Sequence, residues 1–177
     1  MQLILLRHAT AIERDAWSGD DDARPLTEEG LARFNRVVCG LQALELRFDL
    51  VLHSPWLRAA QTAALLAPVL DGPQRLTPDL AVSPTGSVIE SLLIQCGAHA
   101  NVALVGHEPF LSELLAALIV APPPVRHSVV PAGAPAPRLG CRWKKGGLAW
   151  LEAEQPAVGG YELVAFLSPA VLRRLAR

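Results

Sequence analysis

Three short segments of this sequence place basic side chains directly after apolar runs. Arg7 and His8 follow "QLILL", His107 follows "NVALVG", and Arg58 comes shortly after "FDLVLHS". Guanidinium groups can grip phosphoryl oxygens in pairs and neutralise the charge of a phosphoryl group during its transfer. A neutral imidazole nitrogen can attack phosphorus and form a covalent intermediate. These four side chains therefore predict a phosphate pocket that supports phosphoryl transfer.

The same residue types also have plainer interpretations. Arg7 and His8 by themselves fit a buried, hydrogen-bonded strand end, and only the addition of Arg58 and His107 favours phosphate chemistry. A metal site built from His8, His53 and His107 is another alternative, which the arginines disfavour because they would repel a cation. We therefore expect no metal and no other cofactor. His53, inside an apolar run, is expected to be a core histidine.

The elements that must position these residues can be predicted from the same runs. Each run is short and apolar throughout, which is typical of a fully buried strand, and helix-like sequence follows each one. Thr27 is the expected N-cap of a helix that continues to about residue 46. Ser54 and Pro55 are expected to begin the next helix, and Pro109 lies in the first turn of a third.

Strands that alternate with helices predict an α/β fold, here a three-layer sandwich with a mostly parallel central sheet flanked by helices. The carboxyl ends of parallel strands share one edge, where ligands bind. The segments "GLAWLEAE" and "YELVAFL" are expected to close the same sheet, and Ser168 and Pro169 to start a last helix. The proline-rich region 121–137 predicts a long surface loop. We expect residues 1–177 to form a single domain.

The composition excludes several classes of partner. Hydrophobic residues make up 51% and charged residues 19% of the 177 residues, and the formal net charge is -1. This charge predicts no partner among nucleic acids or anionic membranes. Cys39, Cys96 and Cys141 are expected to be packing thiols in a reducing compartment. The start "MQLILLRH" lacks the features of a signal peptide, and no apolar stretch approaches the roughly 20 residues of a membrane span, so we expect a cytoplasmic location.

The motifs around these residues resemble those of a known family. "LLRHATA" at residues 5–11, "SPWLRAAQTA" at 54–63 and "VALVGHEPFLSELL" at 102–115 occur in the order typical of the histidine phosphatase superfamily, also called the phosphoglycerate mutase-like or RHG family. Ala9 replaces the usual glycine. "ARPLTEEG", "WKKGGLAWLE" and "LSPAVLRRL" resemble specifically the SixA-type phosphohistidine phosphatase branch. The resemblance covers nearly the whole chain.

The resemblance implies a phosphoglycerate mutase-like fold and a role for each of the four residues. It implies that His8 is the nucleophile that becomes phosphorylated and that His107 faces it and stabilises the transferring phosphoryl group. Arg7 and Arg58 would clamp the phosphoryl oxygens, so that the same four residues bind phosphate. Water would then hydrolyse the phosphohistidine intermediate, with no metal, because the arginines supply the positive charge.

One departure from the family bears on the substrate. Relatives that act on larger substrates place an acid in a segment like "PDLAVSPTG", at a position that is Val82 here. A general acid typically contributes about 10²- to 10⁴-fold when an oxygen leaving group must be protonated. An imidazole leaving group, with a reference pKa of about 6.5, needs less help. The missing acid therefore favours a phosphohistidine substrate over a phosphate ester.

Some carboxylates remain as stand-ins for the missing acid, namely Glu13, Asp15, Asp79 and Glu108. Glu108 is the candidate proton donor, with a polar residue at a helix start as its plainer interpretation. The run from Asp20 to Asp22 is interpreted as a solvated loop, or alternatively as an acidic lid that repels highly charged substrates. Lys144 and Lys145 are expected to be surface charges, and Trp56 a packing residue.

The primary functional hypothesis is a phosphohistidine phosphatase in signal transduction, whose partner is a phosphorylated protein such as a phosphorelay or phosphotransfer carrier. The first alternative is a phosphatase for a small phosphate ester such as a sugar phosphate. The second is a non-catalytic phosphoprotein-binding module. The pair His8 and His107 disfavours that module, because binding needs the arginines but no nucleophile facing a second histidine.

Overall fold

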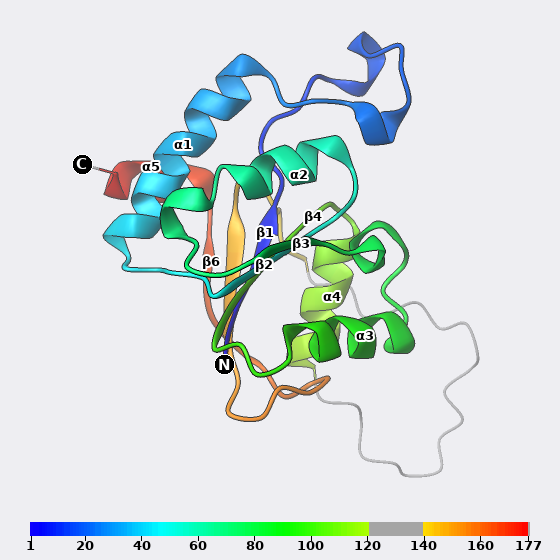
Figure 1. Cartoon of the computed structure of the whole chain (residues 1–177), viewed down its shortest axis with the longest axis vertical. Helices are drawn as coiled ribbons and strands as arrows, with labels where there is room; N and C mark the ends of the chain where they lie inside the picture. The colour runs from blue at the N-terminus through cyan, green and yellow to red at the C-terminus, as the bar shows by residue number, and fades with distance from the viewer. Residues whose placement is uncertain (121–139, 177) are drawn as a thin grey trace.

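A six-stranded sheet forms the centre of the computed structural model, which describes residues 1–120 and 140–176 (Figure 1). The strands lie in the order β3-β2-β4-β1-β5-β6. The first four in the sequence are parallel, whereas β5 runs antiparallel to both β1 and β6. The strands are β1 (Gln2–Arg7), β2 (Leu50–His53), β3 (Gln74–Leu76), β4 (Asn101–Gly106), β5 (Leu148–Glu152) and β6 (Glu162–Leu167).

Five α-helices cover the sheet in the described part of the chain: α1 (Glu28–Ala43), α2 (Leu57–Ala64), α3 (Gly86–Cys96), α4 (Phe110–Ile119) and α5 (Pro169–Leu175). Short 3-10 turns lie between them: η1 (Arg14–Ala16), η2 (Asp21–Ala23), η3 (Ala67–Val69) and η4 (Pro78–Ala81). The α/β sandwich expected from the sequence is confirmed, with a mixed sheet whose parallel part carries the three predicted strands.

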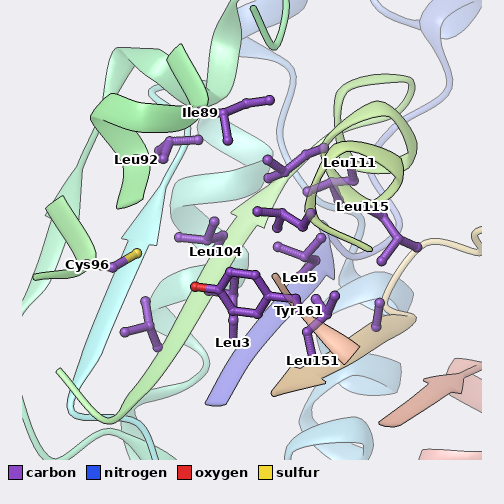
Figure 2. Packing of buried hydrophobic residues seen from close by; sticks show 14 of the residues in the cluster. Leu3, Leu5, Ile89, Leu92, Cys96, Leu104, Leu111, Leu115, Leu151 and Tyr161 are labelled. Carbon is purple, nitrogen blue, oxygen red and sulfur yellow. The ribbon is translucent and has the colours of Figure 1, made fainter. Parts of the chain in front are cut away.

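The two faces of the sheet build two separate cores. Leu3 and Leu5 of β1 pack with α3 and α4, as Figure 2 shows, whereas Ile4 and Leu6 pack with α1, α2 and α5. Successive side chains of a strand point to opposite faces, so an unbroken apolar run is what a strand covered on both faces requires. This double burial leaves the end of the strand as the place where polar side chains can leave the core.

Helix boundaries partly follow the predictions. The Thr27 side chain accepts a hydrogen bond from the Gly30 N–H at 2.9 Å, and Ser168 caps α5, as expected. The expected start of α2 is wrong, because Ser54 extends β2 by donating its N–H to the Val105 carbonyl, and Trp56 is the N-cap. Pro109 is likewise the N-cap of α4, which begins at Phe110, and does not lie in the first turn of that helix.

Three further predictions concern the end of α1, the cysteines and the proline-rich region. Helix α1 ends at Ala43, before the expected residue 46, and Glu45, whose φ is 56°, lies outside the conformation that a right-handed helix requires. Cys96 is a buried packing thiol and Cys141 is half-buried, but Cys39 is exposed on α1, so the packing prediction is wrong there. The predicted loop 121–137 lies outside the described residues.

None of the helices in the described ranges is long and apolar enough to span a membrane.

Candidate active site

The ends of β1 and β4 bring two histidines together. The two strands are parallel neighbours in which Arg7 pairs with Gly106, and the His8 N–H continues the ladder by donating to the Gly106 carbonyl at 3.0 Å. The rings of His8 and His107 follow directly, with centroids 5.1 Å apart. Both rings are buried, at 5% and 6% exposure. The register of the parallel pair thus places two imidazoles near each other at one edge of the sheet.

Arg58 reaches the same edge from the second position of α2. Its guanidinium lies 4.4 Å from the centre of the Trp56 ring, and that ring in turn lies 4.4 Å from the centre of the His107 ring. Stacking of this kind holds a guanidinium over an aromatic face. The structure therefore brings Arg58 and both histidines together, and Trp56 forms part of the site as well as a packing contact.

The His8 ring has a defined tautomer. Its Nδ1 lies 2.7 Å from the carbonyl oxygen of Ala9. Because a carbonyl oxygen only accepts hydrogen bonds, Nδ1 must carry the proton in the neutral ring, and Nε2 keeps its lone pair. An imidazole in this state is ready to attack phosphorus.

The His107 ring is held differently. Its Nε2 lies 2.8 Å from the Ser54 hydroxyl, which can either donate or accept. Its buried Nδ1 has no hydrogen-bond partner among the described residues. When the hydroxyl donates to Nε2, Nδ1 carries the proton and can donate to a phosphoryl oxygen.

The two arginines present unpartnered donors to the site. Arg7 donates from Nη1 to the Trp143 carbonyl, and Arg58 donates to Asp21, from Nη1 to its carbonyl at 2.5 Å and from Nη2 to its carboxylate at 2.9 Å. The Nε atoms of both arginines are buried and have no partner within the described part of the chain. Buried donors without a partner are rare, and an anion that reached these Nε atoms would satisfy them.

Burial keeps both histidines neutral. The pKa of His8 falls to about 2, first because burial disfavours the charged ring, and then through the repulsion of His107, Arg58 and Arg7. The pKa of His107 falls to about 3 through burial and the repulsion of Arg58, which the Asp21 carboxylate partly offsets. Two neutral imidazoles between two cations suit a site whose ligand brings negative charge.

A cavity of about 320 Å³ adjoins His107. Trp56, Val82 and Phe110 supply apolar lining, and Glu108 lies in the same wall. The pKa of Glu108 is raised, mainly by burial. One of its carboxyl oxygens accepts from the Ser112 hydroxyl at 2.7 Å, and the other is buried without a partner in the described ranges. The position where relatives were expected to carry an acid, Val82, therefore does line this cavity and brings no carboxylate.

The other candidate residues are held elsewhere. Glu13 is exposed and pairs with Lys145 at 2.9 Å, and Asp79 accepts hydrogen bonds from Ser91 and Gln95. Asp15 is exposed. His53 is buried and its Nδ1 lies 2.9 Å from the Ser54 carbonyl, as expected of a core histidine. Across residues 1–120 and 140–176, no group of three or more His, Cys, Asp or Glu side chains is arranged to hold a metal ion.

Sequence reasoning missed three contributors to the site. Asp21, which the sequence places in a solvated run, binds Arg58, and Ser54, which fits a helix cap, binds His107. Thr62 carries no signal of its own in the sequence. Its buried hydroxyl accepts from the Ala9 N–H at 3.0 Å and donates to the Arg58 carbonyl at 2.6 Å. Ala9 itself fits without a positive φ, since Glu45 is the one non-glycine residue with positive φ in the described chain.

Comparison with known proteins shows to which family the chain belongs. Residues 3–81 match the model of the histidine phosphatase superfamily (branch 1). The phosphohistidine phosphatase SixA of Escherichia coli (strain K12) is 31% identical over 122 residues, which cover 67% of this chain and 74% of that protein. The chain belongs to the histidine phosphatase superfamily. The resemblance seen in the three sequence motifs is thus confirmed.

Solved structures of the histidine phosphatase superfamily share the fold. The protein histidine phosphatase SixA complexed with tungstate aligns with a TM-score of 0.73 at 24% identity, over 97% of this chain and 99% of that one. A putative alpha-ribazole-5'-P phosphatase from Escherichia coli aligns with a TM-score of 0.67 at 21% identity, over 96% and 97%. The phosphoglycerate mutase-like arrangement is therefore confirmed, and superfamily members named for different phosphate substrates share it.

Proposed function

We propose that this protein is a phosphohistidine phosphatase that removes the phosphoryl group from a histidine of a partner protein through a phosphorylated His8. The observation that carries the proposal is the hydrogen bond from His8 Nδ1 to the Ala9 carbonyl in a buried, neutral ring. It leaves Nε2 as a nucleophile in a ring that lies beside a second histidine.

In the first step, Nε2 of His8 attacks phosphorus and the P–N bond of the substrate breaks. The bonding electron pair stays on the leaving nitrogen, and a proton on the other nitrogen of the substrate ring makes the leaving group a neutral imidazole. Arg7 and Arg58 hold the phosphoryl oxygens and neutralise their charge, a role in which two guanidinium groups can act without a metal. The Nδ1–H of His107 adds a further donor to the transferring group.

In the second step, water attacks phosphorus and the bond to Nε2 of His8 breaks. Because the Ala9 carbonyl keeps a proton on Nδ1, the ring departs as neutral imidazole and needs no proton from elsewhere. The electron pair returns to Nε2, and one proton of the water passes to the phosphate product or to solvent. The same hydrogen bond thus makes His8 both a nucleophile and a good leaving group.

The cavity beside His107 supports a phosphohistidine substrate. Its wall at Trp56 and Phe110 offers aromatic and apolar surface for an imidazole ring, and Val82 supplies no acid for an alcohol leaving group. The likeness to SixA supports the same substrate class. We propose that the enzyme acts in the cytoplasm on a signalling or phosphotransfer carrier.

One observation favours a second candidate, a phosphatase for small phosphate esters. Glu108 lines the cavity, and burial raises its pKa, which favours the protonated carboxyl more than at an exposed glutamate. A carboxyl in that state can protonate an alkoxide leaving group. The alpha-ribazole-5'-P phosphatase with the same fold also supports this candidate.

The test is phosphate release from a chemically phosphorylated histidine carrier protein beside p-nitrophenyl phosphate, with EDTA present. Wild type, His8→Ala and Glu108→Gln would be compared. We expect turnover of the phosphoprotein that His8→Ala abolishes and Glu108→Gln preserves. Turnover of the ester alone would establish the second candidate, and loss of turnover on an alkyl ester such as a sugar phosphate in Glu108→Gln would assign Glu108 as its proton donor. No phosphate release from either substrate, together with tight binding of an oxyanion such as phosphate, would identify a binding module.

A further inference from the structure

A second cavity, of about 310 Å³, lies beside the segment that follows His8. Ala9 and Thr10 line it, together with the first half of α1, the start of α5 and the turn at 144–146. This cavity is distinct from the one beside His107, and the two have no lining residue in common.

The lining of this second cavity is cationic over an apolar floor. Its charged members are Arg33, Lys144, Lys145 and Arg173, and no acidic residue of the described chain lines it. Arg33 already pairs with Glu29 at 2.5 Å and Lys145 with Glu13, but no described residue forms an ion pair with Lys144 or Arg173. The floor includes the buried Phe34, Val37 and Pro169. In a chain of net charge -1, this is a local concentration of positive charge.

Backbone contacts join this cavity to the catalytic edge. The Gly146 N–H donates to the carbonyls of Arg7 and His8, both at 3.0 Å. Consecutive Cα atoms are about 3.8 Å apart, so Thr10 lies within about 7.6 Å of His8. A protein bound over His8 covers about 800 Å² of its partner, a patch roughly 30 Å across, which would extend over the cavity.

The exposure of the cations favours a protein ligand over a small metabolite. The Arg33 side chain is 57% exposed and that of Lys145 28%. Small-molecule sites bury most of their ligand against a few enclosed polar groups. Partly exposed charges beside a reaction centre instead steer and select a macromolecular partner.

We propose that the cavity bounded by Arg33, Lys144, Lys145 and Arg173 binds an acidic segment of the phosphorylated protein substrate. The inference rests on the proposed function and adds to it a rule for partner choice. Glutamate or aspartate side chains pair with the cations. An extended chain covers about 3.3 to 3.6 Å per residue, so positions three to six from the phosphohistidine reach about 10 to 20 Å, beyond Thr10 and within a patch roughly 30 Å across.

Synthetic phosphohistidine peptides test this proposal without knowledge of the natural partner. One peptide carries four glutamates three to six residues from the phosphohistidine, and the other carries four glutamines there. We expect the wild-type KM to be about tenfold lower for the glutamate peptide, with equal kcat, since a few partly exposed ion pairs combine to this size. High salt should erase the preference.

Two matched double variants locate the effect. Arg33→Glu/Arg173→Glu changes residues that line the cavity, and Arg36→Glu/Arg174→Glu makes the same change of charge on exposed positions of the same helices outside it. The first variant should lose the glutamate preference and the second should keep it. Turnover of p-nitrophenyl phosphate should be unaltered in both, which shows that the fold and the catalytic groups are intact.

The outcomes separate this inference from the proposed function. Equal KM values for the two peptides in the wild type, or equal losses in the two double variants, would overturn the acidic docking site and leave the phosphatase intact. Turnover of p-nitrophenyl phosphate without turnover of either peptide would instead overturn the proposed function, and the docking site with it.

Discussion

The ends of β1 and β4 deliver the same kind of side chain to the same site and prepare it differently. His8 at the end of β1 is bound at Nδ1 by a backbone carbonyl, which fixes its proton there. His107 at the end of β4 is bound at Nε2 by the Ser54 hydroxyl, which can reverse its hydrogen bond. A carbonyl can only accept a hydrogen bond, so it fixes the proton on His8 Nδ1 and leaves Nε2 as the nucleophile. A hydroxyl can donate or accept, so the proton of His107 can lie on either ring nitrogen. The hydrogen-bond partner, more than the ring itself, assigns the chemistry.

The electrostatic surroundings widen this difference. Burial and both arginines lower the pKa of each ring, and the Asp21 carboxylate partly offsets this at His107. A bound phosphoryl group brings negative charge that further favours a proton on His107. His107 is therefore the ring of the pair that is easier to protonate.

The largest expected effect is the loss of the nucleophile. His8→Asn should lower kcat for the phosphoprotein by at least about 10⁴-fold, because no covalent intermediate can form. His53→Asn is the matched control, since His53 is also buried with its Nδ1 near a backbone carbonyl. It should retain kcat within about tenfold. Single-turnover labelling with phosphoprotein would check the result, and a phosphorylated His8→Asn enzyme would contradict the assignment.

Removal of the second histidine should have a smaller effect. His107→Asn loses one donor to the transferring group, which typically lowers kcat by about 10²- to 10³-fold. KM should change much less than kcat if this donor acts mainly in the transition state. Steady-state kinetics on both substrates would measure the split, and a loss as large as that of His8→Asn would remove the proposed asymmetry.

The buried neutral histidines predict that acid destabilises the fold. Their folded pKa values of about 2 and about 3 lie below the unfolded value, so the unfolded chain binds more protons as the pH falls below about 6.5. Stability is therefore intact above that pH, and by pH 5 it should have fallen by about 2 kcal/mol for each histidine. Urea unfolding at pH 7 and pH 5 would measure the change.

The doubly substituted His8→Asn/His107→Asn protein is the control for this measurement. It should show a shallower dependence of the unfolding free energy on pH. Identical slopes in the variant and the wild type would mean that the two histidines bind as many protons in the folded protein as in the unfolded chain.

A substitution of Ser54 tests the hydrogen bond to His107 without changing His8. Ser54→Ala leaves Nε2 of a buried ring without its partner, and a hydrogen bond of this kind contributes about 1 kcal/mol, or roughly fivefold in rate. The variant should lower kcat by about this factor. The pH dependence of kcat should shift as well, because the hydroxyl no longer selects the tautomer. An unchanged pH profile would show that Ser54 only fills space.

Asp21 should give the smallest effect and one of opposite sign. Its carboxylate accepts from Nη2 of Arg58 and would compete with a bound phosphoryl group for that donor. Asp21→Asn should therefore bind inorganic phosphate or vanadate a fewfold more tightly, and Asp22→Asn, an equal change of charge on the next residue, should not. Inhibition constants would measure this, and weaker binding in Asp21→Asn would mean that Asp21 holds Arg58 in place.

The strand ends could be predicted well because the pattern that marks them is local. Apolar runs that stop at Arg7 and before His107 are typical of buried strands that end at a polar site, and their order along the chain revealed the family. The same kind of pattern misassigned Ser54, since a serine followed by proline fits a helix cap as well as it fits a partner for a distant histidine. The contact of Asp21 with Arg58 spans 37 residues and depends on how a loop folds back, so no local pattern encodes it. The strand β3 was missed because its three residues are exposed.

Ala9 has a consequence for the unfolded chain. At position 9 this protein has an alanine, whose methyl group restricts the backbone more than a glycine would in every conformation, folded or not. Since Ala9 adopts an ordinary backbone conformation here, its methyl group removes disordered alternatives without straining the native turn. The segment after His8 is thus stabilised in two ways. The alanine lowers the conformational entropy of the unfolded chain, and the Ala9 N–H donates a hydrogen bond to the Thr62 hydroxyl in the folded protein.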